Sequence, residues 1–406
     1  MFARATKVGM VAAWALLTVL GTSAASHANQ PTQFVRLYTM QPVGFGGRMM
    51  FTGFATGKVL HTADGGQIFG FDLNQNGNDG LLASARTISP NGQVAASVET
   101  WDQTTMKITK TIVMTRTMDD FVTEGIFAND VGLVLHEHVV HNHNQRSFHL
   151  LKPVAGNKFN GVWTPPNSAN FLLDQIAVNQ TTTTAAAFGE DLAGSPLLFS
   201  SNIAANTFGP VFHLNPNHFS LADGPKVAED IVNNDAVIAT SPDAGAVGGQ
   251  VPLIAIIDLA TGKMRSFNGV MIPPFNSGYV NGFAVDSATG IGCTSTELDA
   301  NIEFYNLKDG SGFNVFLPGA NGGQFFSGEA VLNDPIHKLF LIAQPNGSVG
   351  PQGDSVIYVY NERGTLIKSI VGFKAWGVTP GMAINPTKRT VYIQGPTDSA
   401  LTQFTY

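Results

Sequence analysis

The sequence has one cysteine, few charged residues and, beyond its first 28 residues, no apolar run long enough to cross a membrane. The single cysteine, Cys293, excludes an internal disulfide, and its apolar neighbours indicate a small buried side chain. Asp, Glu, Lys and Arg make up 13% of the chain, about half the usual share, so neutral polar groups must form most of the surface. The net charge is −7 and no basic stripe is present, which argues against a nucleic acid partner.

Common catalytic motifs are missing as well. The sequence contains no Gly-x-Ser-x-Gly and no phosphate-binding glycine pattern with its lysine. No helical periodicity of any length follows the N-terminal segment, and the 44 glycines fit turns. The pattern therefore favours an all-β protein and gives no support to a serine-nucleophile hydrolase or a P-loop enzyme.

The N-terminal segment has the layout of a secretory signal peptide. Arg4 and Lys7 precede an apolar run from Val8 to Leu20, and Ser26-His27-Ala28 offers small residues for cleavage. The apolar run is too short to span a bilayer comfortably. We expect residues 1–28 to be removed on export to the periplasm or the cell exterior, and the mature chain to lack a membrane span.

A short strand-and-turn phrase recurs along the chain. It reads Gly125-Ile126-Phe127-Ala128-Asn129-Asp130 in one copy and Gly381-Met382-Ala383-Ile384-Asn385-Pro386 in another. The polar residue that closes the strand falls at positions 129, 179, 234, 286, 333 and 385, at intervals of 50, 55, 52, 47 and 52 residues. A period of this size indicates an array of similar structural units.

Each unit reads as four short strands. The phrase gives a strand, a turn and a second strand, and a third strand ends in another recurrent turn: Asp258–Gly262, Asn306–Gly310 and Asn361–Gly364. Four antiparallel strands in about 50 residues is typical of a β-propeller blade. Dividing residues 29–406 by this length predicts one all-β domain of seven four-stranded blades, with eight as the nearest alternative.

The two ends of the chain offer strands that can close such a ring. Gln33–Tyr38 reads as a strand without a unit of its own, and the last unit stops after three strands at Tyr406. We expect these segments to pair, because closure removes exposed sheet edges.

The two kinds of turn resemble those of the exported YVTN-type and lactonase-like β-propellers. The turn Asp258–Gly262 and the strands that end in Asn or Asp carry this resemblance, which spans nearly the whole mature chain. The tetrapeptide that names the family is absent, and Phe340–Ala343 and Val391–Gln394 stand in its place. The resemblance implies the propeller fold and transfers no catalytic residue.

A histidine-rich hairpin is the first candidate site. His136 and His138 lie in one expected strand and His149 in the next. We expect His138 to pair with His149, which would bring His136, His138 and His149 to one face as ligands of a divalent transition metal such as zinc or copper. The alternative is a polar hairpin with solvated histidines.

Asp72-Leu73-Asn74-Gln75-Asn76-Gly77-Asn78-Asp79 is a second candidate, for calcium. Oxygen ligands at its first, third and fifth positions and the glycine at the sixth match the opening of a calcium loop. Ala83 stands where the bidentate glutamate belongs. The alternative is an ordinary turn between the third and fourth strands of a blade.

Carboxylates near the start of the phrase form a third candidate. If the first strand of each blade lines the central channel, they could ring one channel mouth and bind a cation or a polyol. The alternative is that they cap strand ends in water. These residues are Glu124, Asp174, Glu229, Asp230 and Glu329.

The sequence therefore predicts an exported, monomeric β-propeller that acts as a binding or interaction module with its ligand at the channel mouth. The partner can be a small molecule, a glycan or a protein. The alternative is an enzyme, either a lactonase-like or a metal-dependent hydrolase, since propellers host both kinds of function.

Overall fold

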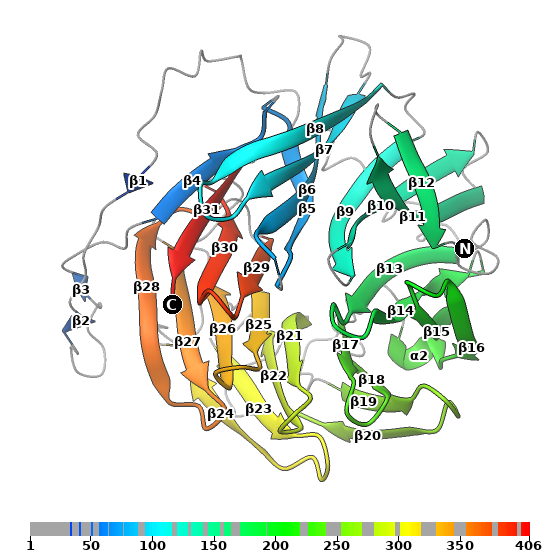
Figure 1. The fold of residues 1–406 in the computed structure, drawn as a ribbon. Helices are drawn as coiled ribbons and strands as arrows, with labels where there is room; N and C mark the ends of the chain where they lie inside the picture. The colour runs from blue at the N-terminus through cyan, green and yellow to red at the C-terminus, as the bar shows by residue number, and fades with distance from the viewer. Residues whose placement is uncertain are drawn as a thin grey trace, which may run out of the picture.

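The structure is a computed structural model that describes the chain in separate stretches. Within them the protein consists of antiparallel strands and one short helix, α2 (Pro216–Phe219) (Figure 1). The described residues are 33–34, 40–41, 50–51, 57–63, 65–75, 77–87, 94–115, 120–128, 131–140, 145–154, 158–163, 171–191, 193–219, 226–240, 253–269, 280–296, 301–317, 330–344, 355–375, 381–395 and 399–406.

Six sheets are each built from four consecutive strands, ordered from the centre of the ring to its rim. From the innermost strand outward, the first two sheets are β5 (Gln67–Leu73), β6 (Asp79–Thr87), β7 (Val94–Asp102) and β8 (Lys107–Thr115), and then β9 (Asp120–Ala128), β10 (Val131–Val140), β11 (Gln145–Val154) and β12 (Lys158–Trp163). The next two are β13 (Phe171–Val178), β14 (Thr184–Asp191), β15 (Pro196–Asn202) and β16 (Thr207–His213), and then β17 (Lys226–Asp230), β18 (Asp235–Thr240), β19 (Leu253–Asp258) and β20 (Met264–Asn268). The last two are β21 (Val280–Asp286), β22 (Ile291–Thr296), β23 (Asn301–Asn306) and β24 (Gly312–Phe316), and then β25 (Ala330–Asp334), β26 (Leu339–Gln344), β27 (Ser355–Asn361) and β28 (Leu366–Phe373).

A further sheet joins the two ends of the chain, and we call it the closing sheet. Its order is β29 (Met382–Asn385), β30 (Thr390–Gln394), β31 (Ala400–Thr405), β4 (Gly57–His61) and β1 (Gln33–Phe34). The short strands β2 (Met40–Gln41) and β3 (Met50–Phe51) pair with each other.

The innermost strands close a ring. β5, β9, β13, β17, β21, β25 and β29 pack against one another in that order, and β29 returns to β5. Figure 1 looks along the axis of this ring, with β28 and β24 at its rim. The predicted all-β propeller fold is confirmed.

The prediction of seven four-stranded blades, with eight as the alternative, was wrong. In the part of the chain that is described, six sheets have four strands, and the sheet that completes the ring has five. Dividing the chain length by the repeat interval treats every blade as one continuous segment. It assigns four strands to each blade, whereas both β4 and β1 from the N-terminal part of the chain join the closing sheet.

The strand that closes the ring also differs from the expected one. β31 pairs antiparallel with β4, from Ala400 opposite His61 to Gln403 opposite Lys58. The pairing of Gln33–Tyr38 with the final strand was therefore wrong, because Gln33 and Phe34 pair with the outer side of β4 instead.

One turn geometry recurs between first and second strands. In the β21–β22 turn, the Asp286 Oδ1 atom accepts hydrogen bonds from the backbone N–H groups of Ala288 (2.9 Å) and Thr289 (3.3 Å). Gly290 follows with a φ of 69° and donates its N–H to the Asp286 carbonyl at 2.8 Å. A short acceptor side chain and a residue in the left-handed region suit this type of turn.

The structure corrects two of the predicted turn positions. Asp230 and Asp334 accept the capping hydrogen bonds of their turns, whereas we had placed Asn234 and Asn333 at the equivalent position. Asn234 instead takes the left-handed conformation, with a φ of 57°. Several Asx residues follow one another in both copies, so sequence spacing alone did not identify the capping residue.

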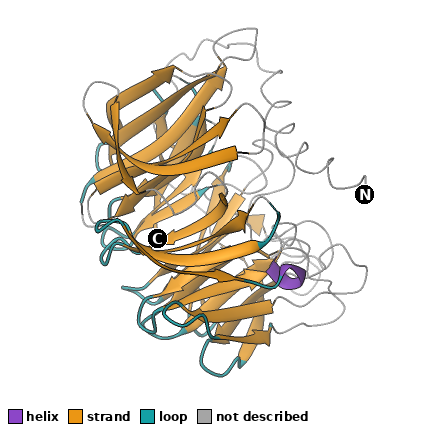
Figure 2. Cartoon of the chain, turned by 90° about the vertical axis from the view of Figure 1, so that its right-hand side faces the viewer, coloured by secondary structure: helices purple, strands orange, loops and turns teal. Residues whose placement is uncertain are grey.

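Turns from first to second strands and from third to fourth strands lie at the same end of the antiparallel sheets, which we call the turn face. Most of the described turns gather on one side of the strands in Figure 2. The turns at this face include residues 179–183, 230–235, 286–290, 334–338 and 385–389 after innermost strands, and 102–106, 258–263, 306–311 and 361–365 after third strands.

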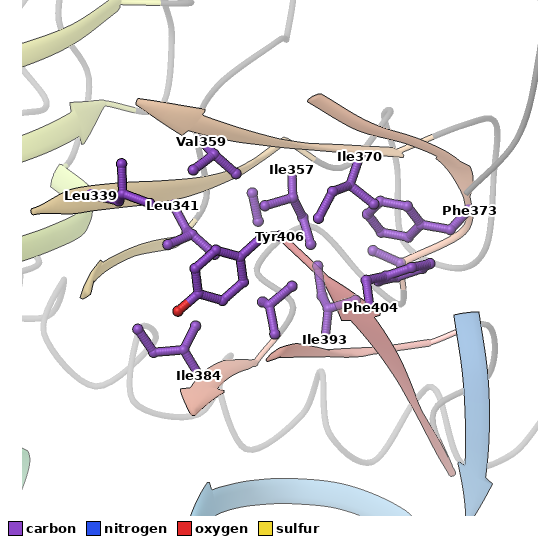
Figure 3. Close-up of a cluster of buried hydrophobic side chains, with 13 residues drawn as sticks. Leu339, Leu341, Ile357, Val359, Ile370, Phe373, Ile384, Ile393, Phe404 and Tyr406 are labelled. Atoms are coloured by element: carbon purple, nitrogen blue, oxygen red, sulfur yellow. The ribbon is translucent and has the colours of Figure 1, made fainter. Parts of the chain in front are cut away.

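Apolar side chains fill the spaces between neighbouring sheets. Figure 3 shows the cluster between the β25–β28 sheet and the closing sheet. The ring centroids of Phe373 and Phe404 lie 4.8 Å apart there, and Phe404 is 2% exposed. Burial of such side chains is the main favourable contribution to folding.

Candidate functional site

Exposed apolar side chains gather on the turn face around the axis of the ring. Val232 is 65% exposed, Ile336 60% and Ile231 41%, and Ala288 and Pro335 are also exposed. These five residues, which we call the apolar arc, lie in the turns that follow β17, β21 and β25. Exposed apolar side chains grouped in this way are typical of interaction surfaces.

Two of the three turns that carry the apolar arc are in direct contact. The Ser287 hydroxyl donates to the Glu229 carbonyl at 3.2 Å and accepts from the backbone N–H of Ile231 at 3.3 Å. The β17–β18 and β21–β22 turns are therefore joined by hydrogen bonds, and β21 packs against β25. The arc therefore spans three neighbouring sheets.

Side-chain caps hold the exposed residues in place. Asp230 Oδ1 accepts from the N–H of Val232 at 3.2 Å, and Asp334 Oδ1 accepts from the N–H of Ile336 at 3.0 Å. Both carboxylates are buried. The backbone is therefore fixed before a partner arrives, which lowers the entropy cost of binding.

The Asp334 carboxylate also makes contacts with its second oxygen. Its Oδ2 lies 2.7 Å from the Nδ1 atom of His337 and accepts from the Tyr406 hydroxyl at 2.8 Å. Burial and this contact with Asp334 raise the pKa of Tyr406. The β25–β26 turn is thus anchored to the closing sheet on one side and exposes Ile336 on the other.

Acidic groups flank the arc at the end of the β17–β20 sheet. Burial raises the pKa of Asp235, and the neighbouring carboxylates of Asp230 and Asp258 add to the rise, while Arg265 opposes it. The Arg265 guanidinium donates to the carbonyl of Leu307 in the next sheet. Three carboxyl groups and one guanidinium thus lie close together at this end of the arc.

The predicted carboxylates do not occupy equivalent positions. Asp230 caps its turn, as described above, and Glu229 precedes it at the end of β17. Glu124 pairs with Leu135 within β9, and Asp174 lies at an irregularity within β13. Glu329 lies outside the described residues. Whether these groups bind a ligand stays a prediction.

Glu229 lies between two sheets. Burial raises its pKa, and hydrogen bonds with the Thr184 side chain and the Asn179 backbone partly counteract this. Its Oε2 atom has no hydrogen-bond partner among the described residues. Glu229 therefore contributes to the contact between the β13–β16 and β17–β20 sheets, close beneath the apolar arc.

The histidine hairpin exists, but its register differs from the expected one by two residues. His136 pairs with His149, and His138 pairs with Ser147. The predicted pairing of His138 with His149 was wrong. Because paired positions and positions two apart share a face of a sheet, this register still assigns positions 136, 138 and 149 to one face.

The segment Asp72–Asp79 contains the β5–β6 turn, between the first and second strands. Asp72 Oδ2 accepts from Gln180 Nε2 at 3.1 Å, and Asn74 Oδ1 accepts from the N–H of Gly77 at 2.9 Å. The Lys388 ammonium donates to Asn78 Oδ1 at 2.5 Å. These oxygens already accept protein donors, one of them cationic, so the arrangement does not favour calcium.

Gln180 is a residue that our sequence reasoning missed. Its Nε2 atom donates to the Leu73 carbonyl at 2.8 Å, and its Oε1 atom accepts from the N–H of Gln75 at 3.1 Å. It thereby ties the β13–β14 turn to the β5–β6 turn, although the β9–β12 sheet lies between them in the ring. The only available signal was an amide at a position where other copies carry Asp, Ser or Pro.

Two further findings concern only the described residues. Their side chains include no group of three or more His, Cys, Asp or Glu that could hold a metal ion. Within the same stretches, no helix has the length and apolar character that a membrane span needs.

Comparisons with known proteins identify the fold. No family model matches the chain, and no curated protein matches its sequence. A chain from the "Crystal Structure of Mitotic Checkpoint Complex" superposes with a TM-score of 0.56 at 14% identity, covering 95% of this chain and 99% of that chain. The β-propeller domain of Myceliophteria thermophila Cps50 (Swd1) gives 0.54 at 12% identity, covering 86% and 99%. Hydrazine synthase from Kuenenia stuttgartiensis gives 0.55 at 10% identity, covering 84% and 96%. At such identities the likeness shows the propeller fold alone.

Proposed function

We propose that this protein is an exported β-propeller that acts as a protein-interaction module and docks its partner on the turn face, over the apolar arc. The observation that carries this proposal is the exposure of Ile231, Val232 and Ile336 on capped turns around the axis of the ring. The propeller fold that the chain shares with a component of a checkpoint complex is consistent with such a role.

The chemistry of the arc favours a protein over a glycan or a small polar molecule. Burying a Val or Ile side chain contributes about 1.5–3 kcal/mol, so three exposed side chains can supply a useful part of a binding free energy. The acidic groups beside Ile231 favour partner residues that carry Lys or Arg at the rim of the contact. We therefore expect a partner with an apolar centre and a basic edge.

The test compares serine substitutions of exposed apolar residues at the arc and at a distant strand. Proteins crosslinked to the wild-type chain in its native compartment are identified, and the best candidate is purified for calorimetry. Val232→Ser with Ile336→Ser should weaken its binding by about 10-fold or more, since each buried methylene contributes about 0.8 kcal/mol. Ile367→Ser is the matched control, because Ile367 is 54% exposed on the outer strand β28. Equal affinity of the double variant and the wild type would refute docking at the arc.

Export is part of the proposal and rests on residues 1–28 of the sequence. Expression in a bacterial host, followed by fractionation and N-terminal sequencing, should give a mature chain that begins near Asn29. A chain that keeps Met1 and remains in the cytoplasm would contradict export and leave the docking test intact.

A metal-dependent hydrolase is the second candidate, favoured by the pairing of His136 with His149. Neutral imidazoles at positions 136, 138 and 149 would supply three ligands and leave one position open for water. Purified protein should then contain stoichiometric zinc or copper that is lost in His136→Ala and retained in the control His213→Ala. Equal metal content in the two variants would end this candidate.

A further inference from the structure

Three turns from two neighbouring sheets meet on the turn face beside the apolar arc. They are the β21–β22 turn with Asp286 and Thr289, the β25–β26 turn with Lys338, and the β27–β28 turn with Glu362. Asp286 is fully buried, and Glu362 is partly buried. Two carboxyl groups from different sheets therefore lie in one small polar cluster.

Thr289 connects the two carboxyl groups. Its backbone N–H donates to Asp286 Oδ1 at 3.3 Å, and its hydroxyl donates to Glu362 Oε1. Asp286 Oδ1 also accepts from the N–H of Ala288 at 2.9 Å. One oxygen of each carboxyl is thus occupied by the same threonine.

The other oxygen of Asp286 has no donor. Asp286 Oδ2 is buried and, in the part of the chain that is described, has no hydrogen-bond partner. A buried carboxylate oxygen without a donor is unfavourable, because the lost hydration is not replaced. A protonated carboxyl next to it would supply the missing hydrogen bond.

We propose that Glu362 carries a proton that it donates to Asp286 Oδ2, so that the two carboxyl groups form a proton-sharing link between the β21–β24 and β25–β28 sheets. Loss of this proton places two negative charges together and weakens the link. The link is therefore a pH-sensitive contact beside the surface that carries the apolar arc.

The electrostatics of Glu362 agree with this assignment. Burial raises its pKa and the charge of Asp286 raises it further, while the Thr289 hydroxyl and the Lys338 ammonium oppose the rise. His337, beside Lys338, is engaged with Asp334 at 2.7 Å. The charged groups around Glu362 are thus Asp286 from one sheet and Lys338 from its own.

The direction of the pH effect follows from this raised pKa. A carboxyl whose pKa is higher in the folded than in the unfolded chain stabilises the fold fully below the unfolded value. That contribution is lost as the pH rises through the folded value. The wild-type protein should accordingly melt at a lower temperature at pH 8 than at pH 5, in part because of Glu362.

Thermal unfolding of the full mature chain between pH 4.5 and 8.5 tests the link. In Glu362→Gln the amide donates to Asp286 at every pH, and in Asp286→Asn the new amide donates to Glu362 and keeps its Oδ1 cap. Both variants should lose about 2 °C or more of the wild-type fall in melting temperature. The control Asp309→Asn removes an exposed carboxylate from a turn at the same face and should keep the fall.

Infrared spectroscopy gives a readout that is independent of stability. Across the same pH range, the wild-type protein should show a protonated-carboxyl C=O band that is reduced in Glu362→Gln and unchanged in Asp309→Asn. An unchanged band and an unchanged pH profile in Glu362→Gln would overturn the proposal. So would a rise in melting temperature on adding Ca²⁺ that Glu362→Gln abolishes, since the carboxyl pair would then bind a cation in place of a proton.

Discussion

The closing sheet packs against a different kind of surface on each of its two sides. Toward the β25–β28 sheet the contact is apolar, and its members include Leu341, Ile357, Phe373, Ile393 and Phe404 (Figure 3). Toward the β5–β8 sheet there is also an apolar cluster, with Trp101 and Tyr392 in it, but a network of amide groups lies beside it.

Gln103 is the centre of that network. It is 1% exposed, and its Nε2 atom donates to the carbonyls of Asn74 (3.0 Å) and Asp79 (2.7 Å). Its side-chain Oε1 atom accepts from Asn385 Nδ2 at 2.8 Å. The backbone carbonyl of Gln103 accepts from the Tyr392 hydroxyl at 3.1 Å and from Gln403 Nε2 at 3.0 Å. The contacts join residues nearly 300 positions apart in the sequence.

The difference teaches how the ring is aligned where its ends meet. Apolar contacts are non-directional and tolerate small shifts. Hydrogen bonds to a buried amide require one geometry. The polar network therefore gives a defined geometry to the contact between the closing sheet and the β5–β8 sheet, which residues 62–66 also connect.

The largest effect should come from removing the closing strand itself. Deleting residues 29–62 removes β4 and exposes the edge of β31, so we expect loss of cooperative unfolding, measured by calorimetry. Deleting residues 29–40 removes β1, whose described pairs are Gln33–Lys58 and Phe34–Gly57, and should leave the fold intact. Equal damage by both deletions would show that β1, not β4, holds the ring closed.

Truncation on the apolar side should be the next largest effect. Phe404→Ala removes a side chain that is 2% exposed and 4.8 Å from Phe373, so we expect a loss of about 3–5 kcal/mol in the free energy of unfolding. Urea denaturation measures it. A loss below about 1 kcal/mol would mean that this side of the sheet is not the main source of its stability.

Removing hydrogen bonds from the polar side should cost less. Gln103→Met keeps the volume but removes the Nε2 donor to the carbonyls of Asn74 and Asp79 and the Oε1 acceptor of Asn385. At about 1 kcal/mol for each lost hydrogen bond, we expect a loss of about 2–3 kcal/mol. In a double-mutant cycle, Gln103→Met and Asn385→Ala should be non-additive, whereas Gln103→Met and Phe404→Ala should add. Additivity within the first pair would remove the basis for treating the network as one unit.

The smallest effect concerns the one hydrogen bond that ties the apolar side to the turn face. Tyr406→Phe removes the donor to Asp334 Oδ2, while His337 remains at 2.7 Å from that oxygen. We expect a loss of about 1 kcal/mol, again by urea denaturation. The replacement His337→Ala is the matched control, and it should add its own loss to that of Tyr406→Phe if the two contacts act independently.

The sequence predicted the structural features that depend on neighbouring residues, such as capped turns. It did not predict features that depend on distant strands. The turns that start at Asn179, Asp286 and Asn385 follow from an acceptor side chain after an apolar strand, because the cap and the strand lie within a few residues. The His136–His149 register depends on a turn outside the described residues and on both neighbouring strands. The expected hairpin centre was therefore displaced by one residue, which shifts the pairing by two.

Contacts between residues far apart in the sequence could not be predicted from any local sequence pattern. Gly57–His61 and Gln33–Tyr38 both look like short strands, and only packing against β31 distinguishes them. Gln103 and Gln180 stand in turns where any polar residue is plausible. The apolar arc was also missed, because isolated Ile and Val residues in turns look like strand residues until their exposure is known.

The antiparallel pairing of β31 with β4 has a consequence for where the chain can be cut. Gln403 lies opposite Lys58, so the end of β31 and the beginning of β4 are neighbours, like the ends of a third and a fourth strand in any other sheet. A short hairpin loop between Tyr406 and Gly57 would make the backbone circular through this sheet. New termini could then be opened opposite the turn face, in a connection that joins two sheets. In the resulting circular permutant the four strands β29, β30, β31 and β4 of the closing sheet would be continuous in sequence, as the strands of the other sheets are.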